Sequence, residues 1–355
     1  MILKKHKFKI QPVLLLLAAF IWGIAFVAQS KGADSVPPFT FNAVRSLLAV
    51  VVLTPLVIVR RRARQRLGYT DEYGYIMPTE KKADTATDKN HIGMNMSQMK
   101  RKLIAASIIC GLLLSAATFI QQYAIQYVET GKCGFLTALY IVLVPIILMF
   151  AGKMPGKNVV TGVAIAVAGL YFLCITKGSA TSIYDVLLIL CALLFAFQII
   201  SIDYFSKDAG IDEDGRNIDR KCGRSHIRGV DGIELSLGQF IVCMISSMIC
   251  MIMFEHPDLA GLRTALLPLL YAGIMSSGVA YTLQIVGMKG MNPTAASLLM
   301  SMESVFSVLA GWLLQGQHLS GRELFGCVLM FLAIVLVQIP RHDINADNDC
   351  KEMRG

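Results

Sequence analysis

The chain has 355 residues, of which 55% are apolar and only 16% are charged, and its mean hydropathy is +0.59. Soluble globular proteins have about 45–50% apolar and about 25% charged residues, so this is the composition of a membrane protein. The net charge of +9 is compatible with a nucleic-acid partner. No cluster of aromatic and basic residues suited to stacking bases occurs, however, and we expect no nucleic-acid binding.

Apolar stretches long enough to cross a bilayer recur along the chain. A hydrocarbon core of about 30 Å takes about 20 residues of α-helix to cross. Eight stretches are free of charge, and two more contain one charged residue each, Arg45 and Glu303. In chain order the predicted spans are 10–30, 38–59, 103–128, 133–152, 158–176, 186–202, 235–254, 264–288, 294–314 and 324–340. We therefore predict an all-α polytopic membrane protein with ten transmembrane helices.

Basic residues fall mostly on one side of these spans. If the N-terminus is cytoplasmic, 27 Lys and Arg lie on the cytoplasmic side and five on the other, with Arg45 inside a span. Cytoplasmic loops carry such an excess, so both termini are predicted to be cytoplasmic. Two long cytoplasmic segments, 60–102 and 206–233, are polar and rich in charge, and we expect them to be flexible. Residues 341–355 are predicted to form a cytoplasmic tail.

The two halves of the chain resemble each other weakly. Segments 124–140 and 285–301 each contain a span, a short polar turn and a span rich in small residues, and 162–173 corresponds to 326–337. Because five crossings is an odd number, a second five-helix unit must enter the membrane from the opposite face. We predict one repeat over residues 1–177 and an inverted repeat over 178–340. Inverted repeats around a midplane site are typical of alternating-access carriers.

Arg45 and Glu303 are the ionisable residues inside the predicted spans. A charge at this depth costs about 2.5 kcal/mol or more unless it faces a cavity or a partner. The helix rise places the two Cα atoms within about 6 Å of the same depth, so an ion pair between them is one hypothesis. The functional hypothesis is that Glu303 binds a proton or a cationic group, while Arg45 binds a substrate carboxylate. The alternatives are a structural salt bridge, or an Arg45 side chain that extends to the membrane surface.

Polar residues recur at helical spacing on six spans, which predicts a shared wet interior. We interpret Trp22 as either a cavity residue or a packing residue, and Ser297, Ser301 and Ser304 as packing residues between helices. The predicted substrate site near the midplane comprises Arg45 and Glu303 together with Trp22, Gln122, Tyr140, Gln198, Tyr281 and Gln284.

Two further features concern packing and cofactors. The spans 158–176 and 322–339 have no polar face, and small residues at Gly162, Ala166 and Gly169 suit close helix contact. This pair of helices either supports the bundle or forms the seam of a homodimer. Pro145 can kink the fourth span. The nine cysteines include no CxxC pair and every histidine lies outside the spans, so we predict no disulfide, no metal site and no cofactor.

Four stretches of the chain are distinctive: Trp22-Gly23, Pro37-Pro38-Phe39 with Arg45, GFLTALYIVLVPI at 134–146, and PTAASLLMSMESVFSVLAGWLLQGQHLSGRELFG at 293–326. These motifs resemble the EamA-type branch of the drug/metabolite transporter superfamily. The resemblance covers nearly the whole chain apart from 60–102 and 206–233. The chain departs from the family where Ser46 replaces a common phenylalanine and Ser304 a common proline. The resemblance implies two inverted five-helix repeats and transport of small metabolites across a bacterial inner membrane.

We predict a secondary carrier that exports small organic metabolites or drugs by alternating access, with Glu303 as the candidate for proton coupling. Its predicted partners are a small-molecule substrate and the lipid bilayer. The alternatives are an intramembrane enzyme, or a membrane receptor or scaffold without transport. A metalloprotease needs His-Glu-x-x-His on a helix, a serine hydrolase needs a buried base, and neither is present. The chain has no P-loop to use ATP, and we predict that it is not an enzyme.

Overall fold

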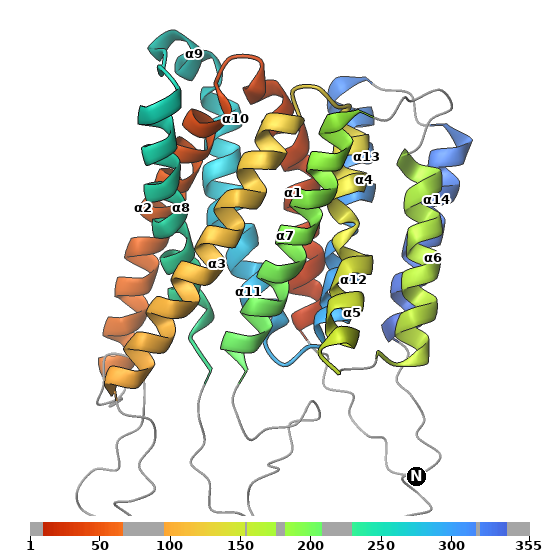
Figure 1. Ribbon diagram of the computed structural model, residues 1–355, viewed down its shortest axis with the longest axis horizontal. Helices are drawn as coiled ribbons and strands as arrows, with labels where there is room; N and C mark the ends of the chain where they lie inside the picture. Colours follow the sequence, from red (N-terminus) through yellow and green to blue (C-terminus); the bar gives the residue numbers. More distant parts are fainter. Residues whose placement is uncertain are drawn as a thin grey trace, which may run out of the picture.

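The computed structural model describes residues 10–66, 96–152, 155–174, 182–207, 229–316 and 320–338, and within these ranges the regular secondary structure is helical (Figure 1). Most of the two segments that we expect to be flexible, and the predicted C-terminal tail, lie outside the described residues.

The first half of the chain contributes six helices. They are α1 (Gln11–Ala33), α2 (Pro38–Arg66), α3 (Met96–Ala124), α4 (Thr130–Ala138), α5 (Tyr140–Phe150) and α6 (Lys157–Cys174). The second half contributes eight α-helices and a π-helix, η4. They are α7 (Ile183–Ser206), α8 (Gly232–Phe254), α9 (Leu259–Thr264), α10 (Leu266–Leu270), η4 (Tyr271–Ala280), α11 (Tyr281–Met288), α12 (Pro293–Met300), α13 (Glu303–Gln315) and α14 (Gly321–Gln338).

Eight helical segments in the described residues are long and apolar enough to cross a membrane. They are α1, α2, α3, α4 with α5, α7, α8, α10 through α11, and α12 with α13. The helices α6 and α14 coincide with the two remaining spans predicted from the sequence. The prediction of an all-α polytopic membrane protein is confirmed, whereas the total of ten crossings stays a prediction.

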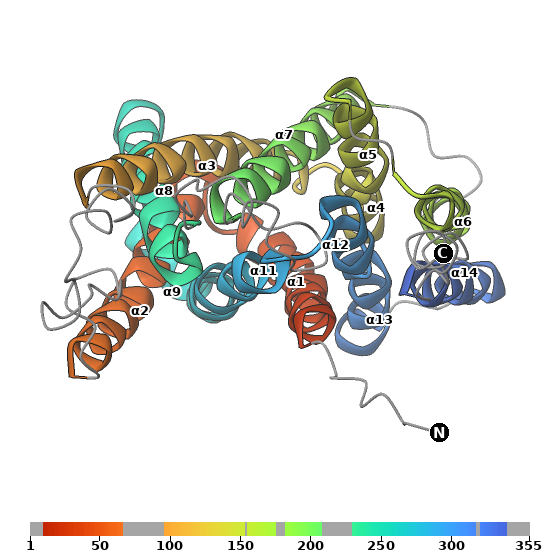
Figure 2. The same cartoon turned by 90° about the horizontal axis from the view of Figure 1, so that it is seen from below.

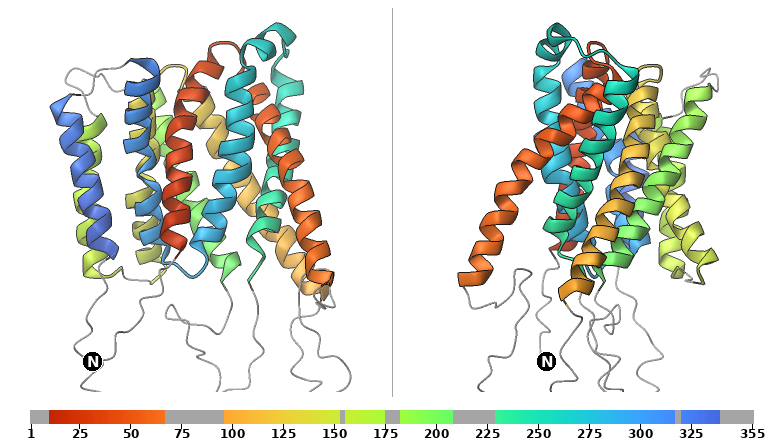
Figure 3. Two further views of the ribbon diagram at one scale, coloured as in Figure 1. Left: turned by 180° about the vertical axis from the view of Figure 1, so that it is seen from behind. Right: turned by 60° about the vertical axis from the view of Figure 1, so that its left-hand side comes forward.

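The long helices stand side by side and run between two opposite faces of the molecule (Figures 1 and 3). We call the face at which α1 begins the N-terminal face. Within the bundle α2 packs along α8, α3 packs against α7 and α8, and α1 packs against α13, α11 and η4. Large apolar side chains such as Val59, Phe254 and Leu313 are exposed on the outside of this bundle. Lipid tails accommodate such a surface, as expected for a membrane protein.

The fourth and ninth predicted spans are each broken near the middle. One break separates α4 from α5 at Leu139, and the other separates α12 from α13 at Ser301 and Met302. Tight turns mark both breaks, since Leu139 N donates to Leu136 O and Met302 N donates to Leu299 O. Pro145 lies inside α5, and a proline disturbs the carbonyl four residues before it, so it does not account for the first break.

The helices α6 and α14 form a pair at one edge of the bundle (Figure 2). Their glycines allow the close contact predicted from the sequence. A Cβ atom added at Gly169 would lie 2.9 Å from the Gly326 carbonyl oxygen and 3.0 Å from the Met330 nitrogen, and one added at Gly162 would meet Val337. The small residues of α6 therefore pack closely against α14 of the same chain. A homodimer seam along this pair stays an untested prediction.

We expect Gly169→Ala to lower the melting temperature of the purified protein in detergent. The added methyl group meets backbone atoms that cannot turn aside, and overpacking costs about 1–3 kcal/mol, more than the roughly 1 kcal/mol gained when alanine replaces glycine in a helix. The matched control is Gly131→Ala in α4, where the nearest atom is 3.7 Å from the added Cβ. An unchanged melting temperature for Gly169→Ala would contradict the close contact between α6 and α14.

Candidate functional site

A cavity lies in the centre of the bundle and is lined by residues from ten helices. Together with the part open to solvent, it comprises about 440 Å³ of space that protein atoms leave empty. Its walls combine aromatic rings, uncharged polar groups and two oppositely charged residues. The lining residues are Trp22, Phe26, Gln29, Arg45, Gln121, Thr137, Tyr140, Phe195, Ile199, Ser276, Tyr281, Gln284, Met300 and Glu303.

Arg45 lies on one wall of this cavity with its guanidinium group held by neutral acceptors. Its Nε donates to the hydroxyl of Ser277 at 3.0 Å, its Nη1 to the side-chain oxygen of Gln29 at 3.2 Å, and its Nη2 to the hydroxyl of Ser276 at 3.3 Å. The residue is only 3% exposed. No described carboxylate forms an ion pair with it, so its positive charge remains available to an anionic group in the cavity.

The π-helix η4 presents both serines to Arg45. Ser276 and Ser277 are consecutive in the chain, and each is a hydrogen-bond partner of the guanidinium group. Gly273, in the same element, allows a close approach to α2, since a Cβ atom added there would lie 3.2 Å from the Arg45 carbonyl oxygen. Such local widening of a helix is common at functional sites.

Glu303 and Tyr140 occupy the opposite wall. The Tyr140 hydroxyl donates to the Glu303 carboxyl at 3.0 Å. Both residues are buried, with Tyr140 4% and Glu303 5% exposed. Each is the first residue after a helix break, so that Tyr140 begins α5 and Glu303 begins α13. A carboxylate in the first turn of a helix is favoured by the helix dipole. The predicted ion pair between Arg45 and Glu303 is not formed, because each binds other residues, yet both face the same cavity.

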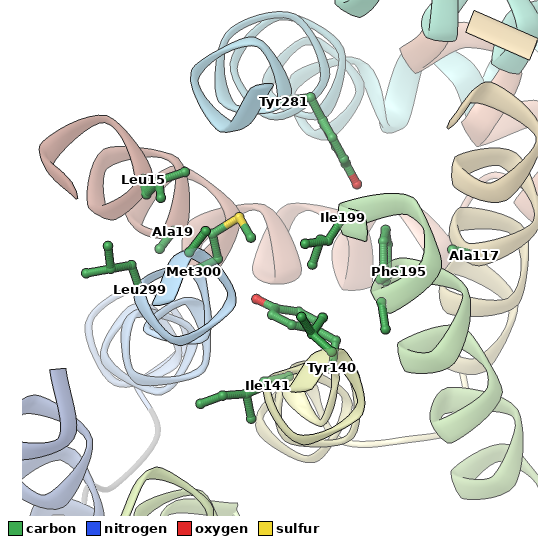
Figure 4. Packing of buried hydrophobic residues seen from close by; sticks show 14 of the residues in the cluster. Leu15, Ala19, Ala117, Tyr140, Ile141, Phe195, Ile199, Tyr281, Leu299 and Met300 are labelled. Carbon is green, nitrogen blue, oxygen red and sulfur yellow. The ribbon is translucent and has the colours of Figure 1, made fainter. Parts of the chain in front are cut away.

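Aromatic rings also line the cavity. The Trp22 and Tyr281 rings meet edge to face with centroids 4.8 Å apart, and the Phe240 ring contacts Tyr281 with centroids 5.4 Å apart. Figure 4 shows the Tyr140 and Tyr281 hydroxyl groups pointing into the same space, with Ile199 and Met300 beside them. Trp22 therefore takes part in both packing and lining, the two roles that the sequence left open.

Of the eight residues predicted to form the site, six line the cavity: Trp22, Arg45, Tyr140, Tyr281, Gln284 and Glu303. The other two are buried outside it. The Gln122 side chain donates to the Gln29 carbonyl oxygen at 3.2 Å, and the Gln198 side chain donates to Gln239 at 3.4 Å. Ser297 and Ser301 bond to carbonyls of their own helix, which agrees with their interpretation as packing residues.

Several lining residues give little or no signal in the sequence, and the predicted site does not include them. Gln121 lines the cavity, whereas its neighbour Gln122 does not. The side chains of consecutive residues point about 100° apart around a helix. Phe195 and Ile199 are four residues apart on one face of α7, but apolar residues give no polar signal. Helical spacing from Gln198 would not have identified them, because every face of α7 is largely apolar.

The cavity can therefore bind a small solute through its charge as well as its shape. A cation fixed on one wall and a carboxyl on the other complement a molecule that carries an anionic group at one end and a cationic or proton-donating group at the other. Among the described residues there is no group of His, Cys, Asp and Glu that could hold a metal ion.

Comparisons with known proteins agree on one class. The model of the EamA-like transporter family matches residues 10–76 and 221–339. An uncharacterized transporter of Archaeoglobus fulgidus is 25% identical over 327 residues, which is 92% of this chain and 84% of the relative. The uncharacterized transporter YoaV of Bacillus subtilis is 20% identical over 320 residues, or 89% and 92% of the two chains.

A solved crystal structure also has this fold. Its TM-score is 0.65 at 17% sequence identity, and the superposition covers 93% of this chain and 96% of the other. At that identity the likeness concerns the fold alone.

We expect Tyr140→Phe to lower the stability of the protein by about 1–3 kcal/mol, because it leaves a buried carboxyl oxygen of Glu303 without its donor. Thermal unfolding in detergent should show that this loss and that of Glu303→Ala, which also removes the hydrogen bond, are not additive in the double variant. Tyr127→Phe is the control, since Tyr127 is 53% exposed. Additive effects of the two substitutions would mean that the hydrogen bond does not couple the two half-helices.

Proposed function

Because the chain belongs to the EamA-like transporter family, we propose that it is a secondary carrier that exports small organic solutes by alternating access. The description of the family and the names of both relatives state that these proteins are transporters. One observation carries the finer proposal: Arg45 and Glu303 face a single central cavity, and neither is neutralised by the other. A polytopic membrane protein with such a cavity is suited to moving a solute rather than transforming it.

Alternating access in this form requires two inverted repeats, and several contacts support them. Arg61 donates to Glu234 at 3.0 Å near the N-terminal face, and Thr40 donates to Glu255 at 2.7 Å near the opposite face. Arg61 precedes Glu255 by 194 residues, and Thr40 precedes Glu234 by the same number. Contacts of this kind, in which equivalent residues exchange partners, are the mark of a two-fold relation.

Two glycines repeat the relation deeper in the bundle. A Cβ atom added at Gly111 would lie 2.9 Å from the Gln239 carbonyl oxygen. One added at Gly273 would lie 3.2 Å from the Arg45 carbonyl oxygen. Arg45 precedes Gln239 by 194 residues, the separation found for the contacts at the two faces. These separations support a correspondence of α2 with α8, and of the segment around Gly111 in α3 with the segment around Gly273 in η4.

The hydrogen bond between Tyr140 and Glu303 supports a two-fold axis through the cavity. Glu129 precedes α4 and Asn292 precedes α12 as N-cap residues, 163 residues apart. Tyr140 and Glu303 are separated by the same number, which supports their equivalence in the two proposed repeats. A residue that contacts its own equivalent lies close to the axis. The solute would then bind beside the axis, near the middle of the bundle.

In this mechanism Arg45 binds a carboxylate of the solute, since its guanidinium has no anionic partner in the described residues. Glu303 binds either a proton or the cationic group of the solute. Without a P-loop, an ion or solute gradient supplies the driving force. The breaks at α4–α5 and α12–α13 give the half-helices next to Glu303 and Tyr140 separate freedom to move, as in other carriers with discontinuous helices.

The proposed location is a bacterial inner membrane with both termini in the cytoplasm. The excess of basic residues on the side of the N-terminus supports this orientation. At the N-terminal face the described residues include Arg60, which pairs with Asp231 at 3.1 Å, and Arg61, which pairs with Glu234. Ten crossings, with α6 and α14 as the fifth and tenth, follow from the same topology.

A flux assay in proteoliposomes tests the proposed function. Purified protein is reconstituted and supplied with amino acids, monocarboxylates, dicarboxylates and amines, with and without an imposed pH gradient. We expect flux of solutes that carry a carboxylate, and we expect it to respond to the gradient. Loading the solutes inside or outside the vesicles gives the direction. If no class of solute moves faster than in protein-free vesicles, the proposed function is wrong.

We expect Glu303→Gln to abolish the part of the flux that depends on the pH gradient. The amide keeps the size of the side chain and can still accept from the Tyr140 hydroxyl, but it cannot bind and release a proton. If Glu303 binds only the proton and not the solute, solute counterflow without a pH gradient should persist in this variant. Glu323→Gln is the charge control outside the cavity, since Glu323 accepts from the exposed Ser320 hydroxyl. Gradient-driven flux at the wild-type rate in Glu303→Gln would remove Glu303 from the coupling.

A further inference from the structure

Two glutamines outside the cavity are buried without a full set of hydrogen-bond partners. Gln198 on α7 and Gln239 on α8 are both 0% exposed. The Nε2 of Gln198 donates to the Oε1 of Gln239 at 3.4 Å, which leaves the Oε1 of Gln198 and the Nε2 of Gln239 without a partner. Exchanging O and N in both amides leaves the same pattern of one free acceptor and one free donor. Unpaired buried groups of this kind are destabilising and require an explanation.

The glutamine pair is the counterpart of the Arg45 cluster in the other half of the chain. Gln239 corresponds to Arg45 through the separation of 194 residues established above. Gln198 follows Gln29 by 169 residues. The same separation relates Phe26 to Phe195, and both phenylalanines line the cavity.

The hydrogen bonds correspond as well. Gln29 accepts from Arg45, and its counterpart Gln198 bonds to Gln239, the counterpart of Arg45. The second half of the chain therefore repeats the solute-binding cluster, with a glutamine where the first half has an arginine.

The two clusters lie at similar depths from opposite faces. Arg45 is seven residues from the start of α2, and Gln239 is seven residues from the start of α8. Those helices begin at opposite faces of the bundle (Figure 1). At 1.5 Å per residue each cluster is about 10 Å from its face. Gln239 does not line the cavity, whereas Tyr281, whose ring contacts Phe240 and Trp22, does.

We propose that Gln198 and Gln239 form a second binding station for the solute, which lines the cavity when the carrier opens toward the N-terminal face. The proposal rests on the proposed function. In that state the free amide hydrogens of Gln239 donate to the solute carboxylate that Arg45 binds in the present state. The carbonyl oxygen of Gln198 accepts from a hydroxyl, an ammonium group or a water molecule that accompanies it.

The exchange of arginine for glutamine makes the two stations unequal. A hydrogen bond from a charged donor to a carboxylate is about twice as strong as one between neutral groups. The solute is therefore held more tightly by Arg45 than by Gln239. A second buried arginine would have held the carboxylate strongly in both states and slowed its release.

The reactivity of a cysteine at position 239 toward a charged reagent added to either face tests the proposed second binding station. Gln239→Cys is made in a chain whose nine native cysteines are replaced by alanine or serine, and the protein is reconstituted in liposomes of known orientation. A charged methanethiosulfonate reagent, which does not cross the bilayer, is added to one face at a time, and labelling is followed by mass spectrometry. The control is Ile241→Cys, two residues further along α8, where the side chain is 37% exposed on the apolar surface.

We expect Gln239→Cys to react from the N-terminal face at least about tenfold faster than Ile241→Cys, and not to react from the opposite face. Equal rates for the two variants, or labelling of Gln239→Cys only from the opposite face, would overturn the proposal. Solute flux by the cysteine-free parent is measured separately. A parent that moves no solute counts against the proposed function, while the labelling still decides whether water reaches Gln239.

The double variant Gln198→Met and Gln239→Met separates a binding role from a structural one. Methionine has a similar length, and removing both amides leaves neither one unpaired, so we expect an unchanged or higher melting temperature. Flux of the carboxylate solutes that the wild type carries should fall at least about tenfold. Wild-type flux in the double variant would show that the amides serve only helix packing and would overturn the proposal.

Discussion

A guanidinium charge held in an apolar helical bundle is the constraint on which the site depends. Arg45 is almost fully buried, and three of its five N–H groups donate to a glutamine and two serines from other helices. These neutral groups solvate the cation without cancelling its charge, which keeps its attraction for an anion. The positions of Gln29 on α1 and of Ser276 and Ser277 on η4 follow from this requirement.

In the inverted repeat that we propose, equivalent positions are not chemically equal. Tyr140 and Glu303 form one proposed pair, and only Tyr140 is the donor in the hydrogen bond that joins them. Arg45 and Gln239 form another, and only Arg45 is charged. An inverted repeat lets the two halves of a carrier exchange their conformations. Under the proposed function, these differences between paired residues make the two states bind a solute with different strength.

The helical spans and the charged residues of the site are predictable from the sequence because both have a large energetic signal. A charge at membrane depth is expensive, so Arg45 and Glu303 are conspicuous within their apolar stretches. The partners of Arg45 give no comparable signal, since serines are common in packed transmembrane helices. Gln121 and Gln122 differ only in the direction of their side chains, which depends on the rotation of α3 in the bundle. The breaks at Leu139 and Ser301 do not change the local hydropathy, and a window of residues cannot detect them.

The π-helix η4 lies where the proposed correspondence between the halves changes by one residue. Gly111 and Gly273, a proposed equivalent pair, are 162 residues apart, whereas Gln121 and Gln284, which both line the cavity, are 163 apart. In this correspondence the second half has one extra residue within the stretch that contains η4. A π-helical turn takes up an additional residue without ending the helix. In α3, which remains α-helical, the corresponding segment carries Ser115, whose hydroxyl bonds to Gly111 of its own helix. The two serines that bind Arg45 therefore lie in the stretch that accommodates the extra residue.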